Sequence, residues 1–106
     1  MLEIDQQGFA AAYAEGARVI DVREPHEYVT GHVPGAQLIP LRSVASSVGQ
    51  IEGSGTVYVI CATGNRSKTA ARTLIDAGLV ALSVQGGTAG WIAAGHPVVQ
   101  GPNALA

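Results

Sequence analysis

Short apolar runs alternate along the chain with stretches that have the spacing of amphipathic helices. The apolar runs are rich in β-branched residues, and their apolar character is nearly continuous, which is typical of strands covered on both faces. They comprise residues 18–22, 36–39, 56–61 and 81–85, with residues 2–4 as a further candidate. The sequence therefore predicts four or five short strands inside a layered domain.

Five further stretches carry apolar residues at helical spacing. In the first, Phe9, Ala12 and Tyr13 form a stripe behind Asp5, which is a suitable N-cap. The stripes lie within residues 5–16, 25–31, 41–49, 71–78 and 88–95. We expect Gly49 to end the third helix and Thr88 to cap the fifth.

Strand and helix thus alternate five times, which predicts an α/β fold. This order favours a mostly parallel sheet of about five strands with helices on both faces. No linker or internal repeat divides the chain, so residues 1–106 are expected to form a single domain. Ligands bind beyond the carboxyl ends of strands in such sheets, which directs attention to the segments after Val22, Ile60 and Gln85.

Composition narrows the class of protein. Of the 106 residues, 47% are apolar and 13% are charged, which excludes a disordered tail and leaves enough apolar side chains for one core. The net charge of −2 gives no support for binding to nucleic acid or to an anionic membrane. No apolar run approaches the length of a membrane span, and no basic start precedes an apolar stretch. We expect a cytoplasmic protein.

The chain has one cysteine, Cys61, and three dispersed histidines. A single cysteine allows neither an internal disulfide nor a zinc site built on several thiolates, and the histidine spacing fits no metal site. We therefore expect no metal and no cofactor.

Cys61 is the residue most suited to chemistry, because a predicted strand delivers it to the start of a helix. Backbone N–H groups at a helix N-terminus favour a thiolate over a thiol. Gly64 permits a positive φ that would turn loop N–H groups inward, and Arg66 adds a cation. The loop is therefore expected to attract a small anion beside a nucleophilic sulfur. The alternative is a buried, inert cysteine, which is the commoner role of a lone cysteine.

Several segments, in order, resemble the rhodanese family of sulfurtransferases. They are Asp21-Val22-Arg23-Glu24-Pro25-His26-Glu27-Tyr28, Gly31-His32-Val33-Pro34-Gly35-Ala36, the loop of residues 61–67, Gly86-Gly87, Trp91 and Gly95-His96-Pro97. The resemblance spans roughly residues 18–98 and implies a single rhodanese-like domain.

This resemblance implies that sulfane sulfur is transferred in two steps. Cys61 would take the outer sulfur of a small anionic donor such as thiosulfate. The resulting persulfide would pass that sulfur to cyanide, to a thiol or to a sulfur-accepting protein. A cradle of loop residues would hold the persulfide, with Arg66 as the main side-chain charge. The cradle comprises Ala62, Thr63, Gly64, Asn65, Arg66 and Ser67.

Other residues near the carboxyl ends of the predicted strands are expected to have supporting roles. Asp21 and Arg23 are expected to form an ion pair that braces the loop. His32 precedes a Val-Pro-Gly turn and is expected to be hydrogen-bonded there rather than to act as a base. The pair Gly86-Gly87 permits a close approach of backbones, and Trp91 is expected in the core or in a pocket wall.

Two alternative functions remain open. The domain could be a sulfur-relay or docking module that acts on a partner protein. A phosphatase or arsenate reductase is a more distant alternative, because related phosphatases have five residues between Cys and Arg, whereas four separate Cys61 from Arg66 here. Many thiosulfate-using relatives also have a basic residue directly after the cysteine. Ala62 occupies that position in this sequence and would weaken the binding of divalent thiosulfate.

Overall fold

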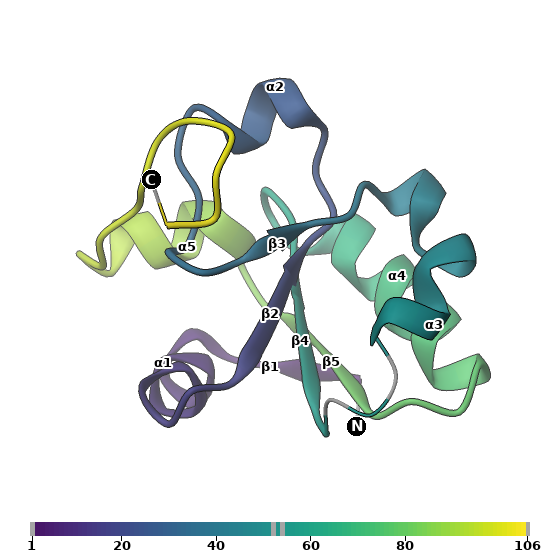
Figure 1. Ribbon diagram of the computed structural model, residues 1–106. Coiled ribbons are helices and arrows are strands. Elements are labelled where there is room, and N and C mark those ends of the chain that lie inside the picture. Colours follow the sequence, from purple (N-terminus) through teal and green to yellow (C-terminus); the bar gives the residue numbers. More distant parts are fainter. Residues whose placement is uncertain (1, 52, 54, 106) are drawn as a thin grey trace.

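Five parallel strands form one sheet at the centre of the protein (Figure 1). The computed structural model describes residues 2–51, 53 and 55–105. The strands are β1 (Glu3–Ile4), β2 (Arg18–Asp21), β3 (Gln37–Leu38), β4 (Val57–Ile60) and β5 (Ala81–Val84). Their order across the sheet is β1-β5-β4-β2-β3, and every pairing among them is parallel. The predicted α/β fold with about five parallel strands is confirmed.

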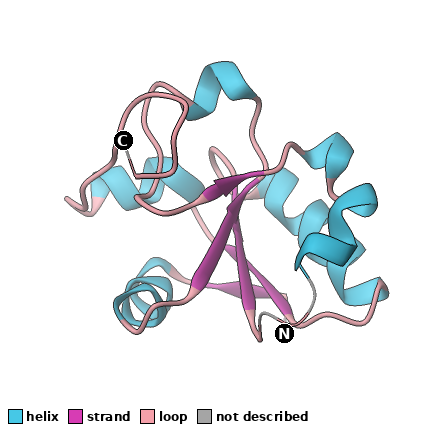
Figure 2. Ribbon diagram, viewed as in Figure 1, coloured by secondary structure: helices cyan, strands magenta, loops and turns pink. Residues whose placement is uncertain are grey.

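Helices cover both faces of this sheet, as the sequence predicts (Figures 1 and 2). On one face lie α1 (Gln6–Ala14) and α5 (Gly87–Ala93), and on the other lie α3 (Val48–Ile51) and α4 (Asn65–Asp76). The connections on either side of β3 hold α2 (Pro25–Tyr28) and two 3₁₀ turns, η1 (Leu41–Ser43) and η2 (Ala45–Ser47). Asp5 caps α1, since its carboxylate accepts a hydrogen bond from Gly8 N at 2.7 Å.

The side chains of the central strands alternate between two apolar cores. Val59 of β4 packs on the α4 side with Leu74. Its neighbour Ile60 points to the opposite side and packs with Phe9 and Trp91. Both faces of β4 are therefore covered, which explains the nearly continuous apolar run in the sequence.

The segment after β3 does not form the single helix that its spacing predicts. It makes η1 and η2 instead, held by bonds such as Val44 N to Leu41 O at 3.2 Å. Gly49 lies inside α3 and does not end a helix. Ser46 Oγ donates to Ser43 O at 3.1 Å. Serine side chains that bond to nearby carbonyls compete with an α-helix, which accounts for the tighter turns.

The predicted cap of the fifth helix is also wrong, because Thr88 lies inside α5. The N-cap is Gly86, with φ 78°, and Gly87 follows with φ 58°. Two successive residues in the left-handed region turn the chain sharply, and only glycine adopts that region without strain. The helix therefore starts at Gly87, and the hydroxyl of Thr88 is free for another role.

Residues 97–104, named the C-terminal tail below, fold back over the connection between α2 and β3 (yellow in Figure 1). Val99 and His32 exchange two backbone hydrogen bonds of 2.9 Å in an antiparallel bridge. The buried His32 ring places Nδ1 2.9 Å from Tyr28 O and Nε2 2.9 Å from Asn103 O. His32 is thus hydrogen-bonded, as the sequence predicts, but it lies in the bridge with Val99 just before the turn at Pro34 and Gly35.

Candidate active site

The carboxyl ends of β2, β4 and β5 lie side by side at one edge of the sheet. Asp21 pairs with Ile60 across β2 and β4, and Val59 pairs with Ser83 across β4 and β5. Cys61 directly follows the central strand, and α4 begins at Asn65. The predicted delivery of the cysteine from a buried strand to the start of a helix is therefore found.

Hydrogen-bond donors of the loop surround the sulfur of Cys61. Gly64 takes the left-handed conformation, with φ 111°, and its N–H donates to Sγ at 3.1 Å. Ser67 Oγ lies 3.3 Å from Sγ, close enough to donate to a thiolate. The same hydroxyl is hydrogen-bonded to Ser83 Oγ at 2.7 Å, so a residue of β5 fixes its position. The sequence gives no signal for this role of Ser83.

Two opposing effects set the acidity of Cys61. Burial raises the pKa of its thiol, and this is the largest single influence. The hydroxyl of Ser67 and the backbone N–H groups of Ser67, Gly64 and Thr63 lower it, and together they outweigh burial. The net pKa lies below the ordinary value, which favours a thiolate.

Burial alone would suit the inert alternative, because Cys61 is only 1% exposed and packs in the core on the α4 side. The surroundings of Sγ are nevertheless polar. A sulfur within hydrogen-bonding distance of the Ser67 hydroxyl and the Gly64 N–H is placed for ionisation, whereas an inert cysteine needs only apolar neighbours.

The turn between β5 and α5 holds the cysteine loop by its backbone. Thr88 N donates to Cys61 O at 2.8 Å, and Ala89 N donates to Ala62 O at 3.1 Å. A Cβ on Gly87 would lie 2.4 Å from Cys61 O, so this close approach requires glycine. Gln6 of α1 supports the same turn, with Nε2 donating to Gly87 O at 2.9 Å. The double glycine was a sequence signal for close approach, whereas nothing in the sequence indicates Gln6.

The structure pairs Arg66 with Glu27 of α2. Arg66 Nη1 donates to Oε1 at 2.7 Å, and Nη2 donates to Oε2 at 2.9 Å. The hydrogen bonds from this guanidinium lower the pKa of Glu27 from 4.5 to about 2, although burial partly opposes them. The cation expected in the cradle therefore has a carboxylate partner that sequence reasoning missed.

Asp21 and Arg23 form the predicted ion pair at the end of β2. Arg23 Nη2 donates to Asp21 Oδ2 at 2.9 Å, and both residues are buried. The same Nη2 donates to Gly31 O at 2.9 Å, which ties the pair to the segment after α2.

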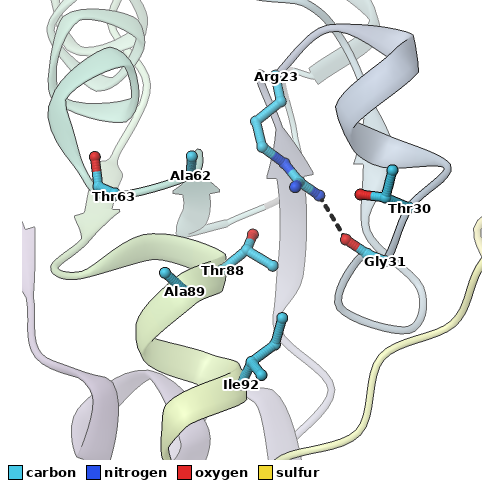
Figure 3. Close-up of a pocket in the computed structure, with 8 residues that line it drawn as sticks. All are labelled: Arg23, Thr30, Gly31, Ala62, Thr63, Thr88, Ala89 and Ile92. Carbon is cyan, nitrogen blue, oxygen red and sulfur yellow. Dashed lines mark hydrogen bonds between the residues drawn. The ribbon is translucent and has the colours of Figure 1, made fainter.

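A pocket of about 240 Å³ opens over the cysteine loop (Figure 3). Three segments contribute to its walls: residues 23–31, which flank α2 on both sides, the cysteine loop and α5. The lining residues are Arg23, Thr30, Gly31, Ala62, Thr63, Thr88, Ala89 and Ile92. Cys61 is not one of the lining residues, although Ala62 and Thr63, which follow it in the chain, are.

The remaining predicted residues occupy several positions around the loop. Asn65 is exposed at the first position of α4, and Ala62 is half-buried at the pocket. Trp91 belongs to the core on the α1 side, where its Nε1 donates to Pro97 O at 2.7 Å. Among residues 2–51, 53 and 55–105, no three His, Cys, Asp or Glu side chains gather as metal ligands would. Within the same ranges, no helix is both long and apolar enough to span a membrane.

Comparison with known proteins decides the family. The sequence profile of the rhodanese-like domain matches residues 5–94. The chain belongs to the rhodanese-like domain family. The matched range of this rhodanese-like domain includes the loop that carries Cys61 and the strands β2 to β5.

The names of two relatives refer to sulfur transfer. Thiosulfate sulfurtransferase GlpE of Pseudomonas entomophila is 37% identical over 82 residues, which cover 76% of this chain and 75% of that protein. The putative sulfur carrier protein YrkF of Bacillus subtilis is 40% identical over 60 residues, covering 57% of this chain and 32% of that protein. The crystal structure of a rhodanese-related protein from Thermoplasma volcanium is 33% identical, with a TM-score of 0.86 over 93% of this chain and 98% of that chain. These similarities place the rhodanese-like domain in a sulfurtransferase or sulfur-relay family.

Proposed function

We propose that this rhodanese-like domain is a sulfurtransferase in which Cys61 carries the transferred sulfur as a persulfide. The observation that carries the proposal is the arrangement around Sγ, where Gly64 N and Ser67 Oγ lie within hydrogen-bonding distance of a sulfur whose pKa is lowered. Inward-facing donors favour the thiolate needed for attack and a persulfide anion afterwards.

In the first step, the Cys61 thiolate attacks the outer sulfur of a donor such as thiosulfate. A new S–S bond forms between Sγ and that sulfur, and the bond between the two donor sulfurs breaks. The electron pair of the broken bond leaves with sulfite, so no oxidant or reductant is needed. N–H groups of the loop stabilise the terminal sulfur of the persulfide as they stabilise the thiolate.

In the second step, a thiophilic acceptor such as cyanide attacks the terminal sulfur. The bond between Sγ and that sulfur breaks, and the electron pair returns to Cys61 as a thiolate. The product is thiocyanate, or a new persulfide when the acceptor is a thiol.

Intact-mass measurement tests the chemistry directly. After incubation with thiosulfate, the protein should gain the mass of one sulfur atom, and cyanide should remove it with release of thiocyanate. Cys61→Ser and Cys61→Ala should show neither the gain nor thiocyanate formation. A Cys61→Ser variant that retained most of the turnover would contradict the role of Cys61.

A sulfur-relay role is the second candidate, and Ala62 favours it. A neutral methyl group directly after Cys61 adds no attraction for divalent thiosulfate. A persulfide received from a partner protein needs no such cation. Slow turnover with free thiosulfate, together with rapid exchange of persulfide with a thiol protein, would favour the relay. Hydrolysis of an aryl phosphate that depends on Cys61 would instead support the phosphatase alternative.

A further inference from the structure

The side-chain amide of Gln6 holds both ends of the turn between β5 and α5. Its Nε2 donates to Gln85 O at 2.8 Å and to Gly87 O at 2.9 Å. Gln6 is the first residue of α1 and lies 79 positions before Gln85, so these bonds join segments that are far apart in the chain. Because two carbonyl oxygens point to one amide nitrogen, the direction of the backbone between them is fixed.

The amide of Gln6 fits closely over α5 at Gly90. A Cβ added at Gly90 would lie 2.7 Å from Gln6 Nε2, and its three nearest contacts would all be atoms of Gln6. The amide is the mobile end of a side chain, so a larger residue at position 90 would push it away from its two carbonyl partners. The missing side chain at Gly90 is therefore what allows Gln6 to reach the turn.

Two buried polar atoms without partners lie at this turn. Among residues 2–51, 53 and 55–105, the buried side-chain atoms that make no hydrogen bond are Gln6 Oε1 and Thr88 Oγ1. Gln6 binds the turn, and Thr88 directly follows it. A buried polar atom without a partner costs stability, and such costs are typical of groups that hold a functional site in one conformation.

The turn contacts the cysteine loop at three places. The backbone N–H groups of residues 88 and 89 donate to the carbonyl oxygens of Cys61 and Ala62. The third place is Gly64, where an added Cβ would lie 3.3 Å from Gly86 N. The N–H of Gly64 in turn donates to Cys61 Sγ at 3.1 Å. A displacement of the turn would therefore move a hydrogen-bond donor of the sulfur.

We propose that Gln6 is a positioning residue for sulfur transfer, which acts through the β5–α5 turn to hold the backbone of Cys61 and Gly64 in the reactive geometry. This inference rests on the proposed sulfurtransferase function and adds to it a residue outside the cysteine loop. Gln6 is not one of the residues that line the pocket, so it acts on the sulfur only through the turn.

The expected consequence of losing Gln6 follows from the donors at the sulfur. The N–H of Gly64 is one of the groups that lower the pKa of Cys61. When the turn is free to shift, this donor is no longer held at Sγ. The thiolate then forms at higher pH, and the persulfide forms more slowly because its stabilising N–H group is displaced.

Gln6→Met tests the proposal, because methionine keeps the length of the side chain and removes both donated bonds. The rate constant for persulfide formation from thiosulfate, followed by intact mass at neutral pH, should fall roughly three- to tenfold. The ultraviolet absorbance of the thiolate against pH should show its midpoint at higher pH, with an acid dissociation constant lower by about threefold or more.

Gln7→Met is the matched control. Gln7 is the next residue of α1 and is exposed. The variant makes the same chemical change in the same turn of the same helix. Its rate constant and its thiolate midpoint should both equal those of the wild type.

Gly90→Ala reaches the same amide from α5. Gly90 lies inside the helix and does not have a positive φ, so alanine suits its backbone. The new methyl group should displace the amide of Gln6 and slow persulfide formation as Gln6→Met does. In a Gln6→Ala background that space is vacated, and adding Gly90→Ala should change the rate by less than about twofold. Equal losses from Gly90→Ala in both backgrounds would contradict a role through Gln6.

The outcomes separate the positioning role from the proposed function. If the wild type forms no persulfide, the proposed function is wrong, and the role of Gln6 in it is wrong as well. If the wild type forms persulfide and Gln6→Met forms it at the same rate, the function stands and the positioning role is wrong. A urea denaturation midpoint that falls in Gln6→Met, with rate constant and thiolate midpoint unchanged, would show that Gln6 is merely structural.

Discussion

At the scale of single residues, the ionisation of Cys61 depends on a balance between burial and hydrogen bonding. Burial raises the pKa of the thiol, and the Ser67 hydroxyl is the strongest of the groups that lower it. Ser67 Oγ is itself hydrogen-bonded to Ser83 Oγ at 2.7 Å, so β5 fixes the donor that faces the sulfur. The balance can therefore be shifted by one hydroxyl group.

Ser67→Ala removes that hydroxyl and leaves the backbone N–H groups in place. We expect the Cys61 pKa to rise, so that the thiolate forms only at higher pH than in the wild type. A hydrogen bond to a charged group contributes about 1.5–3 kcal/mol, so the acid dissociation constant should fall by roughly tenfold or more. The ultraviolet absorbance of the thiolate, followed against pH, measures the change.

Ser83→Ala is the matched control, because it removes the next hydroxyl and keeps the one that touches Sγ. Its effect on the Cys61 pKa should have the same sign and be clearly smaller. Equal pKa values in Ser67→Ala and the wild type would show that the hydroxyl does not stabilise the thiolate.

A second residue-scale prediction concerns Glu27, whose pKa is lowered from 4.5 to about 2 by the hydrogen bonds from Arg66. A lowered carboxyl pKa stabilises the fold above pH 4.5, and this stabilisation is lost as pH falls toward about 2. Because both side chains are partly exposed, solvent screening limits the effect to about 1 kcal/mol. Glu27→Gln should lower the free energy of unfolding by that amount at neutral pH, and denaturant titrations at neutral and acidic pH should show the difference shrinking with acid.

Arg42→Gln is the control for this pair, because Arg42 forms a more exposed ion pair with Glu24. Its free energy of unfolding should stay within about 0.5 kcal/mol of the wild type. A loss in Glu27→Gln that did not shrink in acid would mean that the carboxylate charge is not its cause.

Residues of the loop could be predicted from the sequence, because Cys61, Gly64 and Ser67 are close together and their types match the chemistry. Their partners could not. Glu27 lies 39 residues from Arg66, and Ser83 lies 16 residues from Ser67. Glutamate on a short helix and serine in a strand are ordinary residues, and only the fold brings them to the site.

At the scale of elements, the turn between β5 and α5 sets the position of the cysteine loop. Thr88 N and Ala89 N donate to the carbonyl oxygens of Cys61 and Ala62. These bonds require the backbone of the turn to lie close to that of the cysteine loop, and Gly87 permits this because it has no Cβ. The neighbouring strands β4 and β5 are therefore joined by further hydrogen bonds between the segments that follow them.

Gly87→Ala should break this junction. The new Cβ would lie 2.4 Å from Cys61 O and 2.6 Å from Ala62 O, at a φ of 58° that an alanine rarely adopts. We expect the free energy of unfolding to fall by about 2 kcal/mol or more, and sulfur transfer to fall more than stability alone explains. Urea denaturation and persulfide formation on the folded variant measure the two effects.

Gly95→Ala provides the comparison. Gly95 also has a positive φ of 87°, but a Cβ there would meet nothing within 4 Å. The cost should be backbone strain alone, about 1 kcal/mol, with persulfide formation unchanged. If Gly87→Ala behaved like Gly95→Ala, the contact with the loop would not be what positions it.

The sequence predicted strands better than helix ends. Strands buried on both faces have long apolar runs, so β2, β4 and β5 were located closely. The segment after β3 misled the helix prediction, because its apolar spacing of three and four fits both an α-helix and successive 3₁₀ turns. The sequence pattern predicts too late a start for α5, because a hydroxyl at Thr88 is a stronger local signal for a cap than the glycines before it.

At the scale of the whole molecule, segments distant in sequence meet to line the pocket and to hold the C-terminal tail in place. The pocket combines three segments from residues 23 to 92. The C-terminal tail lies beyond residue 94, where the family match ends, yet it holds the buried His32 through Asn103 O and pairs with it through Val99.

Removal of residues 97–106 should therefore destabilise the domain without changing its sheet. The deletion removes the bridge between His32 and Val99 and leaves a buried ring nitrogen without Asn103. We expect the free energy of unfolding to fall by about 2 kcal/mol or more, since each lost bond contributes about 1 kcal/mol. Denaturation followed by circular dichroism measures this, and the folded baseline should keep its α/β signal.

Gln100→Ala, a change within the same tail, is the control. Its side-chain bond to Thr30 O is long, at 3.4 Å, and exposed. The variant should match the wild type within about 0.5 kcal/mol. Equal stability of the truncated and complete chains would show that the tail does not support the fold.

The α/β fold class and the covering of both sheet faces by helices could be predicted, because the alternation of strand and helix constrains both strongly. The pocket and the hydrogen bonds of the C-terminal tail could not be predicted, because they depend on contacts between segments rather than on any local pattern. Neither Thr30 nor Ile92 differs, as a sequence position, from other surface residues.

The short helix α5 serves two purposes at once. Thr88 and Ile92 of this helix line the pocket. The backbone N–H groups of its first turn donate hydrogen bonds to the carbonyl oxygens of Cys61 and Ala62. A molecule in the pocket would contact the same helix whose backbone is hydrogen-bonded to the cysteine loop. One seven-residue helix therefore both lines the pocket and supports the loop that carries the sulfur.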